Sequence, residues 1–294
     1  MAFSGCMVRK SANQTTANYG AGAIVTWDAE AFDVGGWHDA VSNTSRLTVP
    51  SGVSYVRVTA NALIDQIGSG FDAFMYVIKN GDDGATRHVN LPYVMEDSTA
   101  GTYHLNLASG PIAVSAGDYF EVVLNLSGDN SVTLWGNGSW FAIEALDSFS
   151  GCLVKKAADQ TTADYSTDAA ISWDTDVIDV GGWHDTGADT SRLTVPSGVS
   201  YVRLSAAVCL SSLATNTDVW IWATKNGDNV AETRHVNLPV THEDSPSSTS
   251  QYLNFLSGPI SVSAGDYFEL RLHAIGDASV TFEDFSWFAI EKIA

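Results

Sequence analysis

The chain of 294 residues is an internal duplication, and the size of the repeat limits the folds that it can adopt. The 14-residue stretch TSRLTVPSGVSYVR occurs at 44–57 and again, letter for letter, at 190–203. The offset between the copies stays between 146 and 148 residues along the whole chain. Each copy is therefore large enough to be a complete domain, whereas solenoid repeats run about 20–50 residues. We expect two tandem domains, residues 1–146 and 147–294.

Each copy is predicted to consist of β-strands. Residues 54–60 (SYVRVTA) alternate polar and apolar side chains, which is the period of a strand with one buried face. Further β-branched or aromatic runs lie at 71–78 and 119–126, and turn sequences such as Asn80-Gly81 separate such runs. Many short strands at intervals of roughly 8–12 residues predict a sandwich or a barrel.

The composition excludes several classes of function. The chain carries 34 acidic and 14 basic side chains, a formal net charge of −20. Such a surface repels phosphate backbones, so we expect no nucleic acid among the partners. No apolar run approaches the ~18–20 residues that span a bilayer, and the first residues show no signal peptide, so no membrane insertion is expected. The three cysteines lack the spacing of a metal site or a disulfide framework and are expected to be buried thiols.

The order of short motifs in both copies resembles one family of β-sandwich. Each copy opens with Phe-Ser-Gly, continues through DVGGWHD and RLTVPSGVSYV, and then carries an Asn-Gly turn, an internal Gly-Asp and a closing SWFAIE strand. This order resembles the C1q/tumour-necrosis-factor-like jelly roll, and the resemblance covers nearly the whole chain. It implies an all-β fold with two tandem antiparallel jelly-roll β-sandwich domains (C1q/TNF-like). It also implies that three chains associate as a homotrimer.

The repeated Trp-His-Asp segment, at 37–39 and 183–185, contains the residue types of an acid–base site in which Asp orients His. Adjacent residues of a strand face opposite ways, however, and no nucleophile motif accompanies the segment. We therefore expect Trp to pack and Asp to hold a turn, and we expect no catalytic residues.

Four arginines stand beside the repeated strands: Arg46 and Arg57 in copy one, and Arg192 and Arg203 in copy two. A planar guanidinium group is suited to binding an anion or a carboxylate of a ligand. The alternative is an internal ion pair or a subunit contact, and this is the interpretation that we favour.

One strand of each copy places two aromatic side chains on one face. Phe74 and Tyr76 in copy one, and Trp220 and Trp222 in copy two, are two positions apart, so each pair shares a face. Flat rings match the apolar faces of pyranose sugars, which makes both pairs candidate ligand-binding residues. The same pairs would also suit the hydrophobic centre of a trimer, and the resemblance favours this second interpretation.

A loop that differs between the copies supplies two more candidates. Residues 135–138 (WGNG) correspond to residues 283–285 (EDF) of copy two, and the two segments differ in sequence. Loops that vary on a constant scaffold are common places for recognition. Trp135 and Asn137 are therefore candidate contacts with a ligand or with another subunit.

A calcium site is the one cofactor that the sequence suggests. Asp82, Asp83 and Asp228 stand beside Asn-Gly turns and offer carboxylate oxygens to a cation that takes ~6–8 oxygen ligands. Their spacing is not that of a calcium loop, and Asn-Gly-Asp is first of all a hairpin turn. No other cofactor is expected.

The resemblance implies a module of the kind found in bacteriophage head or tail appendages, and we therefore expect a non-enzymatic virion surface protein: a phage head decoration or spike, or a tail-fibre component. We expect it on the virion surface, as a trimer that contacts host surface polysaccharide or another receptor and gains avidity from multivalency. One alternative is a purely structural cement or connector that binds other virion structural proteins. Another is a bacterial secreted adhesin-like lectin. A glycan hydrolase would need paired carboxylates facing a cleft, and the sequence singles out no pair.

Overall fold

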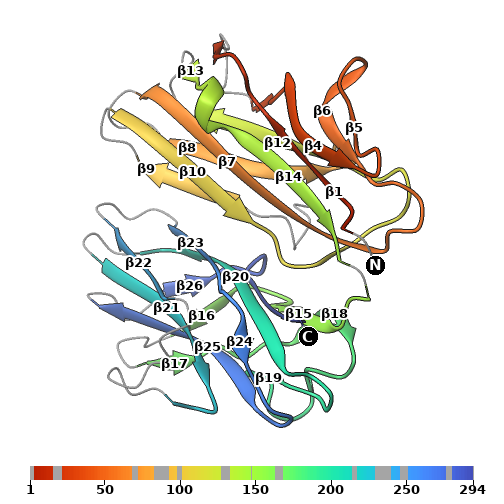
Figure 1. The fold of residues 1–294 in the computed structure, drawn as a ribbon. Helices are drawn as coiled ribbons and strands as arrows, with labels where there is room; N and C mark the ends of the chain where they lie inside the picture. Colours follow the sequence, from red (N-terminus) through yellow and green to blue (C-terminus); the bar gives the residue numbers. More distant parts are fainter. Residues whose placement is uncertain are drawn as a thin grey trace. The chain divides into compact units, whose positions relative to one another are not determined.

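The computed structural model describes residues 3–15, 22–67, 72–82, 93–97, 101–126, 133–146, 148–162, 168–213, 217–228, 240–245, 251–275 and 280–293. The chain divides into two compact units, Met1–Asp147 and Ser148–Ala294, coloured red to green and green to blue (Figure 1). This division falls one residue after the boundary expected from the repeat. Within the described residues, no helix has the length and hydropathy that spanning a bilayer requires.

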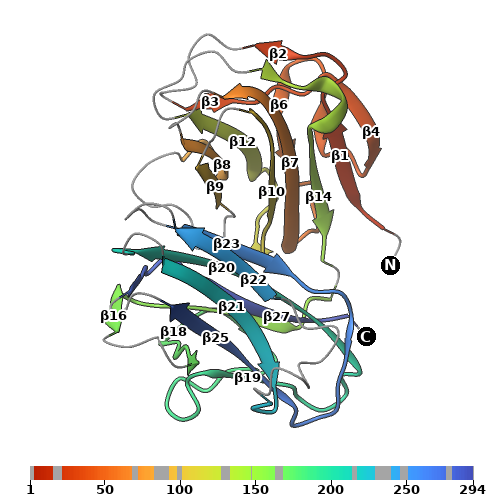
Figure 2. The same ribbon diagram turned by 90° about the vertical axis from the view of Figure 1, so that its left-hand side faces the viewer.

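The first unit contains two antiparallel sheets that face each other (Figure 2). The first sheet has the order β2 (Gln14–Thr15), β13 (Thr133–Leu134), β7 (Tyr55–Ile67), β14 (Trp140–Ala145), β1 (Gly5–Arg9) and β4 (Ala29–Val34), with β10 (Gly101–Ala108) and β11 (Ile112–Ala113) also paired to β7. The second sheet has the order β5 (His38–Asp39), β6 (Asn43–Thr48), β12 (Tyr119–Leu126), β8 (Asp72–Lys79) and β9 (Tyr93–Asp97), with β3 (Ala23–Ile24) paired to β12. A short 3-10 turn, η1 (Gly136–Gly138), precedes β14.

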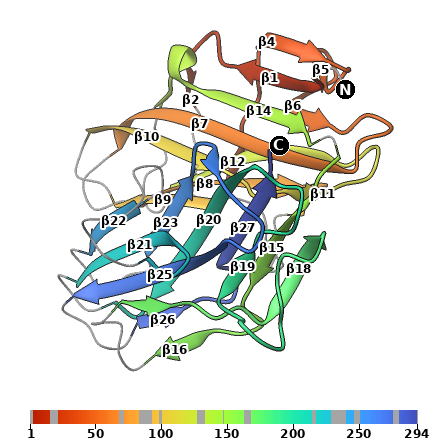
Figure 3. The ribbon, with the colours of Figure 1, turned by 60° about the horizontal axis from the view of Figure 1, so that its bottom comes forward.

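The second unit repeats this arrangement. Its first sheet has the order β16 (Gln160–Thr162), β26 (Val280–Phe282), β20 (Tyr201–Ser211), β27 (Trp287–Lys292), β15 (Gly151–Lys155) and β18 (Thr175–Val180), with β23 (Gln251–Leu256) and β24 (Ile260–Ser261) also paired to β20. Its second sheet has the order β17 (Ala169–Ala170), β25 (Tyr267–Ile275), β21 (Thr217–Lys225) and β22 (Val240–Ser245), with β19 (Arg192–Thr194) paired to β25. The neighbouring strands β25, β21 and β22 are seen in Figure 3.

The connections make each unit a jelly roll. The first and last strands of a unit are neighbours: Cys6 of β1 lies opposite Ile143 of β14, and Cys152 of β15 lies opposite Ile290 of β27. Between them the chain crosses repeatedly from one sheet to the other, for example from β6 to β7 and on to β8. The predicted fold, two tandem antiparallel jelly-roll sandwiches, is confirmed.

The core of each unit lies between its two sheets and is rich in aromatic side chains. In the first unit the rings of Trp27 and Phe141 have centroids 6.1 Å apart, and in the second Trp173 and Phe288 are 6.2 Å apart. All four side chains are buried, and burial of one such ring stabilises the fold by roughly 2–3 kcal/mol. Three free cysteines are also buried, as predicted: Cys6, Cys152 and Cys209.

Candidate ligand-binding site

The aromatic residues of the central strand in the second unit lie as period two predicts. In β21, Val219 and Ile221 point into the hydrophobic core. Trp220 and Trp222 alternate with them and therefore lie on the outer face of the sheet. Trp220 is half-buried there, whereas Trp222 is only 1% exposed.

The two tryptophans line a pocket of about 210 Å³ together with Asp168, His273 and Ile275. The sequence patterns did not predict Asp168, His273 or Ile275 as site residues. His273 and Ile275 are two positions apart on β25 and share its outer face, and the strand register places His273 directly opposite Trp220. Asp168 immediately precedes β17, which pairs with β25 on its other side. Two neighbouring strands, β21 and β25, and the residue before β17 therefore supply the lining.

A hydrogen bond fixes the polar side of the pocket. His273 Nδ1 lies 2.6 Å from Asp168 Oδ1, and the two side chains are 26% and 29% exposed. The Trp220 ring meets the His273 ring edge to face, with centroids 5.8 Å apart at 83°. Because a carboxylate accepts, His273 Nδ1 carries a proton, and in the neutral form of the ring Nε2 is an acceptor.

Arg271, which lies opposite Trp222 in the register of β25 and β21, is already paired. Its Nη2 donates to Glu269 Oε2 at 3.1 Å, and its Nη1 donates to the backbone oxygen of Asp168 at 3.5 Å. The guanidinium group therefore supports the backbone at Asp168 and pairs with Glu269, a carboxylate that it shares with Arg192.

The corresponding positions of the first unit differ in chemistry. Phe74 and Tyr76 are half-buried on the outer face of β8, and Asn125 of β12 lies opposite Phe74, where the second unit has His273 opposite Trp220. Gly22 occupies the position of Asp168 with φ at +79°, and a Cβ added there would lie 3.3 Å from Tyr76 Oη. The first unit thus keeps the aromatic pair, but it has neither partner of the His–Asp hydrogen bond.

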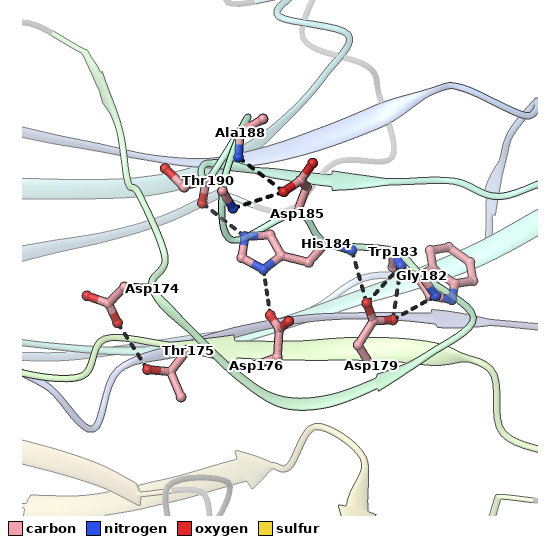
Figure 4. A network of polar contacts seen from close by, with 11 residues as sticks. Asp174, Thr175, Asp176, Asp179, Gly182, Trp183, His184, Asp185, Ala188 and Thr190 are labelled. Atoms are coloured by element: carbon pink, nitrogen blue, oxygen red, sulfur yellow. Dashed lines mark hydrogen bonds and ion pairs between the residues drawn. The ribbon is translucent and has the colours of Figure 1, made fainter.

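The Trp-His-Asp segments hold a turn, as expected. In Figure 4 the carboxylate of Asp179 accepts hydrogen bonds from three consecutive backbone N–H groups, those of Gly182, Trp183 and His184, at 3.0–3.3 Å. Trp183 is buried in the core. Asp185 accepts from two backbone N–H groups of the following turn, and these bonds lower the pKa of its carboxyl.

The histidine of this segment is also structural. The His184 side chain is fully buried, with Nδ1 2.5 Å from Asp176 Oδ1 and Nε2 3.1 Å from the backbone oxygen of Thr190 (Figure 4). His38 makes the equivalent contact with Glu30 at 2.8 Å. Both ring nitrogens are therefore occupied by the protein itself, which leaves neither to act on a substrate.

The four arginines form ion pairs inside their own units, which confirms the favoured interpretation. Arg57 is 2% exposed and pairs with Glu144 on the neighbouring strand. The nitrogen–oxygen distances are 2.9 Å for Arg57–Glu144, 3.2 Å for Arg203–Glu291, 3.2 Å for Arg46–Glu121 and 3.5 Å for Arg192–Glu269. Their charges are thus used within the sandwich.

The calcium candidates lie at hairpin turns. Asn80 and Gly81 have φ of 58° and 73°, as a two-residue type I′ turn requires, and the N–H of Asp82 donates back to Lys79. Asp228 has the same place after Asn226-Gly227, whereas Asp83 lies outside the described residues. Among the residues that the structure describes, no three His, Cys, Asp or Glu side chains are grouped so that they could hold a metal ion. The donor set that calcium prefers is therefore not assembled in the described part of either turn.

The loop candidate Trp135 is 41% exposed and lies directly before η1, with its N–H bonded to the backbone oxygen of Leu63. Asn137 is inside this turn, and its side chain is outside the described part of the structure. Neither residue belongs to the pocket of the second unit.

Sequence differences between the two copies mark the three pocket residues that the strand pattern did not predict. Asp168 replaces Gly22, His273 replaces Asn125 and Ile275 replaces Ser127, all within otherwise similar segments. Period two places 273 and 275 on one face, but only the pairing of β25 with β21 and β17 brings them to the tryptophans.

No protein-family model matches the chain. No curated protein matches it in sequence. Among solved structures, murine APRIL at pH 5.0 is similar to 50% of this chain over 100% of its own length, with 15% identity and a TM-score of 0.38. Murine APRIL at pH 8.0 covers 49% of this chain with 13% identity and a TM-score of 0.33. The globular domain of zebrafish complement 1qA covers 50% of this chain over 98% of its own length, with 12% identity and a TM-score of 0.36.

Proposed function

We propose that the protein is a non-enzymatic carbohydrate-binding protein whose second unit carries the ligand site. The supporting observation is the pocket in which Trp220 and Trp222 meet the hydrogen-bonded pair of Asp168 and His273. Aromatic rings match the apolar C–H faces of a sugar, and a few fixed polar groups orient its hydroxyls. This combination is typical of a binding pocket on a rigid scaffold.

The proposed setting is the surface of a virion, with three chains in one assembly. This part rests on the resemblance of the sequence motifs to a family of trimeric jelly rolls. The net charge of −20 on each chain suits an exposed particle surface, because like charges keep such particles soluble and apart. Three sites in one assembly would convert weak individual binding into avidity.

The test is a glycan array probed with the full chain, combined with host-cell adsorption and a native mass measurement. We expect signals for defined glycans, competition of cell binding by the same glycans, and the mass of three chains. A monomer that binds neither glycans nor cells contradicts the proposal. A monomer that does bind glycans would favour the lectin-like adhesin over the virion component.

A second candidate, a connector between virion proteins, is favoured by an exposed apolar cluster in the first unit. Phe3, Phe32 and Val34 are 54%, 40% and 47% exposed, and the rings of Phe3 and Phe32 meet edge to face at 5.7 Å. Adjoining exposed apolar side chains often mark a protein contact. For a connector, Phe32→Ser would abolish assembly with virion proteins, while the glycan array would be blank for the unaltered chain.

A further inference from the structure

We propose, on the basis of the carbohydrate-binding function above, that the pocket of the second unit takes one neutral sugar ring and selects against acidic sugars. The selection comes from His273 acting as a hydrogen-bond acceptor beside the Asp168 carboxylate. The proposal also implies that each chain has one such sugar site, in its second unit.

The proposed selection depends first on the orientation of the His273 ring. Its Nδ1 is committed to Asp168 Oδ1 at 2.6 Å, which fixes the tautomer with the proton on Nδ1. Among the described residues, none forms a hydrogen bond with Nε2 of this pocket-lining side chain. The lone pair on Nε2 therefore needs a donor, and a sugar hydroxyl is one.

The proposed selection depends, second, on the charged groups around the pocket. Among the residues that the structure describes, the lining comprises one carboxylate, one imidazole, two indoles and one aliphatic side chain, and it includes no lysine or arginine. The neighbouring Arg271 is bonded to Glu269 Oε2 at 3.1 Å and to the backbone oxygen of Asp168 at 3.5 Å, so it is already engaged within the protein. The carboxylate of an acidic sugar would meet Asp168 and an acceptor nitrogen, whereas the hydroxyls of a neutral sugar match both.

The volume of the pocket limits the size of the sugar that it can take. Its volume of about 210 Å³ is below the roughly 300–1,000 Å³ of pockets for drug-sized ligands. One pyranose ring, rather than an oligosaccharide, suits this volume. The half-buried Trp220 presents indole surface to its apolar face, the almost fully buried Trp222 lies at the back of the lining, and the His–Asp side meets its hydroxyls.

The first unit provides the internal comparison. Gly22 and Asn125 stand where the second unit has Asp168 and His273, so the fixed acceptor pair is missing there. The aromatic residues Phe74 and Tyr76 remain. If the acceptor pair decides binding, a saturated chain holds one sugar and not two.

The experiment is calorimetric titration of the full chain with methyl glycosides. The panel contains neutral hexosides and N-acetylhexosaminides, and for each hexoside the uronic acid of the same configuration, with a sialic acid glycoside added. We expect at least one neutral glycoside to bind with one site per chain, and its uronic acid to bind at least about tenfold more weakly. We also expect raised salt to leave the neutral affinity unchanged.

Variants assign the effect to the histidine. His273→Asn introduces the residue of the first unit. It should weaken the binding of the neutral sugar at least about tenfold and leave the unfolding midpoint unchanged. Asp168→Asn, which keeps the shape of the side chain but releases the tautomer, should reduce the preference for neutral over acidic sugars. Asn125→Ala, at the equivalent strand position of the first unit, is the matched control and should bind like the parent chain.

The outcomes are distinguishable. Equal or tighter binding of an acidic sugar, two sites per chain, or parental affinity in His273→Asn overturns this inference and leaves the carbohydrate-binding function standing. A blank result for every sugar in the panel and on the array overturns both.

Discussion

Asn80 and Asp118 join two turns of the first unit: the Asn80 amide donates to Asp118 Oδ1 at 2.8 Å. The side-chain Oδ1 of Asn80 accepts from the backbone N–H of Tyr119 at 2.9 Å, and Lys79 Nζ lies 2.8 Å from Asp118 Oδ2. The second unit repeats the bond between Asn226 and Asp266 at 2.8 Å. The recurring Asn-Gly and Gly-Asp sequences are therefore two ends of one network, which explains why each copy contains both.

This network predicts a loss of stability in acid. Burial raises the pKa of Asp118, but hydrogen bonds from Asn80, Lys79 and Ser115 outweigh it and lower the pKa from 3.8 to about 2. The pKa of Asp266 is lowered to about 2 for the same reasons. A carboxyl with a lower pKa in the folded state stabilises the fold above its unfolded pKa, and this contribution disappears as the pH falls through about 2.

The size of the acid effect follows from the two carboxyls. This lowering of each pKa corresponds to roughly 2 kcal/mol in the free energy of unfolding. Because both carboxyls are partly exposed, solvent screening reduces the contribution of each to about 1 kcal/mol. Urea unfolding midpoints should therefore fall between about pH 5 and pH 2. In Asp118→Asn combined with Asp266→Asn the midpoint should be lower at neutral pH and should change less over that range. An identical pH dependence in parent and variant would contradict the assignment.

A second prediction concerns the carboxylate that anchors the Trp-His-Asp segment. Asp33 accepts from the N–H groups of Gly36, Trp37 and His38 at 3.0–3.2 Å, and Trp37 is buried in the core. Asp33→Ala leaves these donors without an acceptor and should lower the free energy of unfolding by roughly 2 kcal/mol. Urea unfolding followed by tryptophan fluorescence measures the change. Asp39→Ala, in the exposed turn nearby, is the control and should have the smaller effect; a larger one would contradict this role of Asp33.

A third prediction compares two tryptophans of one core. Trp37 Nε1 donates to Ser4 Oγ and to the backbone oxygen of Val34, both at 3.2 Å. Trp27 Nε1 is buried and, among the described residues, has no hydrogen-bond partner. Both replacements by Phe remove similar apolar area, but only Trp37→Phe breaks hydrogen bonds. It should cost about 1 kcal/mol more than Trp27→Phe.

The second unit allows the comparison to be repeated. Trp183 Nε1 donates to Ser150 Oγ and Val180 O, whereas Trp173 Nε1 is buried without a partner in the described part of the chain. Trp183→Phe should therefore be the more costly change, again in urea unfolding. If Trp27→Phe and Trp173→Phe prove the more damaging members of their pairs, ring packing rather than the indole N–H decides stability.

Local patterns were enough to predict the duplication, the strands and the face that Trp220 and Trp222 share, because period two acts within a single strand. They were not enough to find Asp168 and His273, which lie 105 residues apart. These residues meet only because β17 pairs with β25, and strand register is set by long-range packing. The partner of Arg57 has the same origin: an internal ion pair was expected, but its choice of Glu144 depends on the pairing of β7 with β14.

The last prediction concerns the thiols. Burial, helped by the nearby charges of Asp33 and Glu30, raises the pKa of Cys6 to about 12, and burial likewise raises the pKa of Cys152. The thiolate is the reactive form, and Cys209 is also only 2% exposed, so none of the three should react in the folded chain at pH 8. With an aromatic disulfide reagent, the absorbance should show no rapid release of thiolate before unfolding and three equivalents in guanidinium chloride. Cys6→Ala should reduce the denatured count by one, which checks the calibration. Rapid, stoichiometric labelling of the folded parent chain would show that the sandwich opens far more readily than its packed core implies.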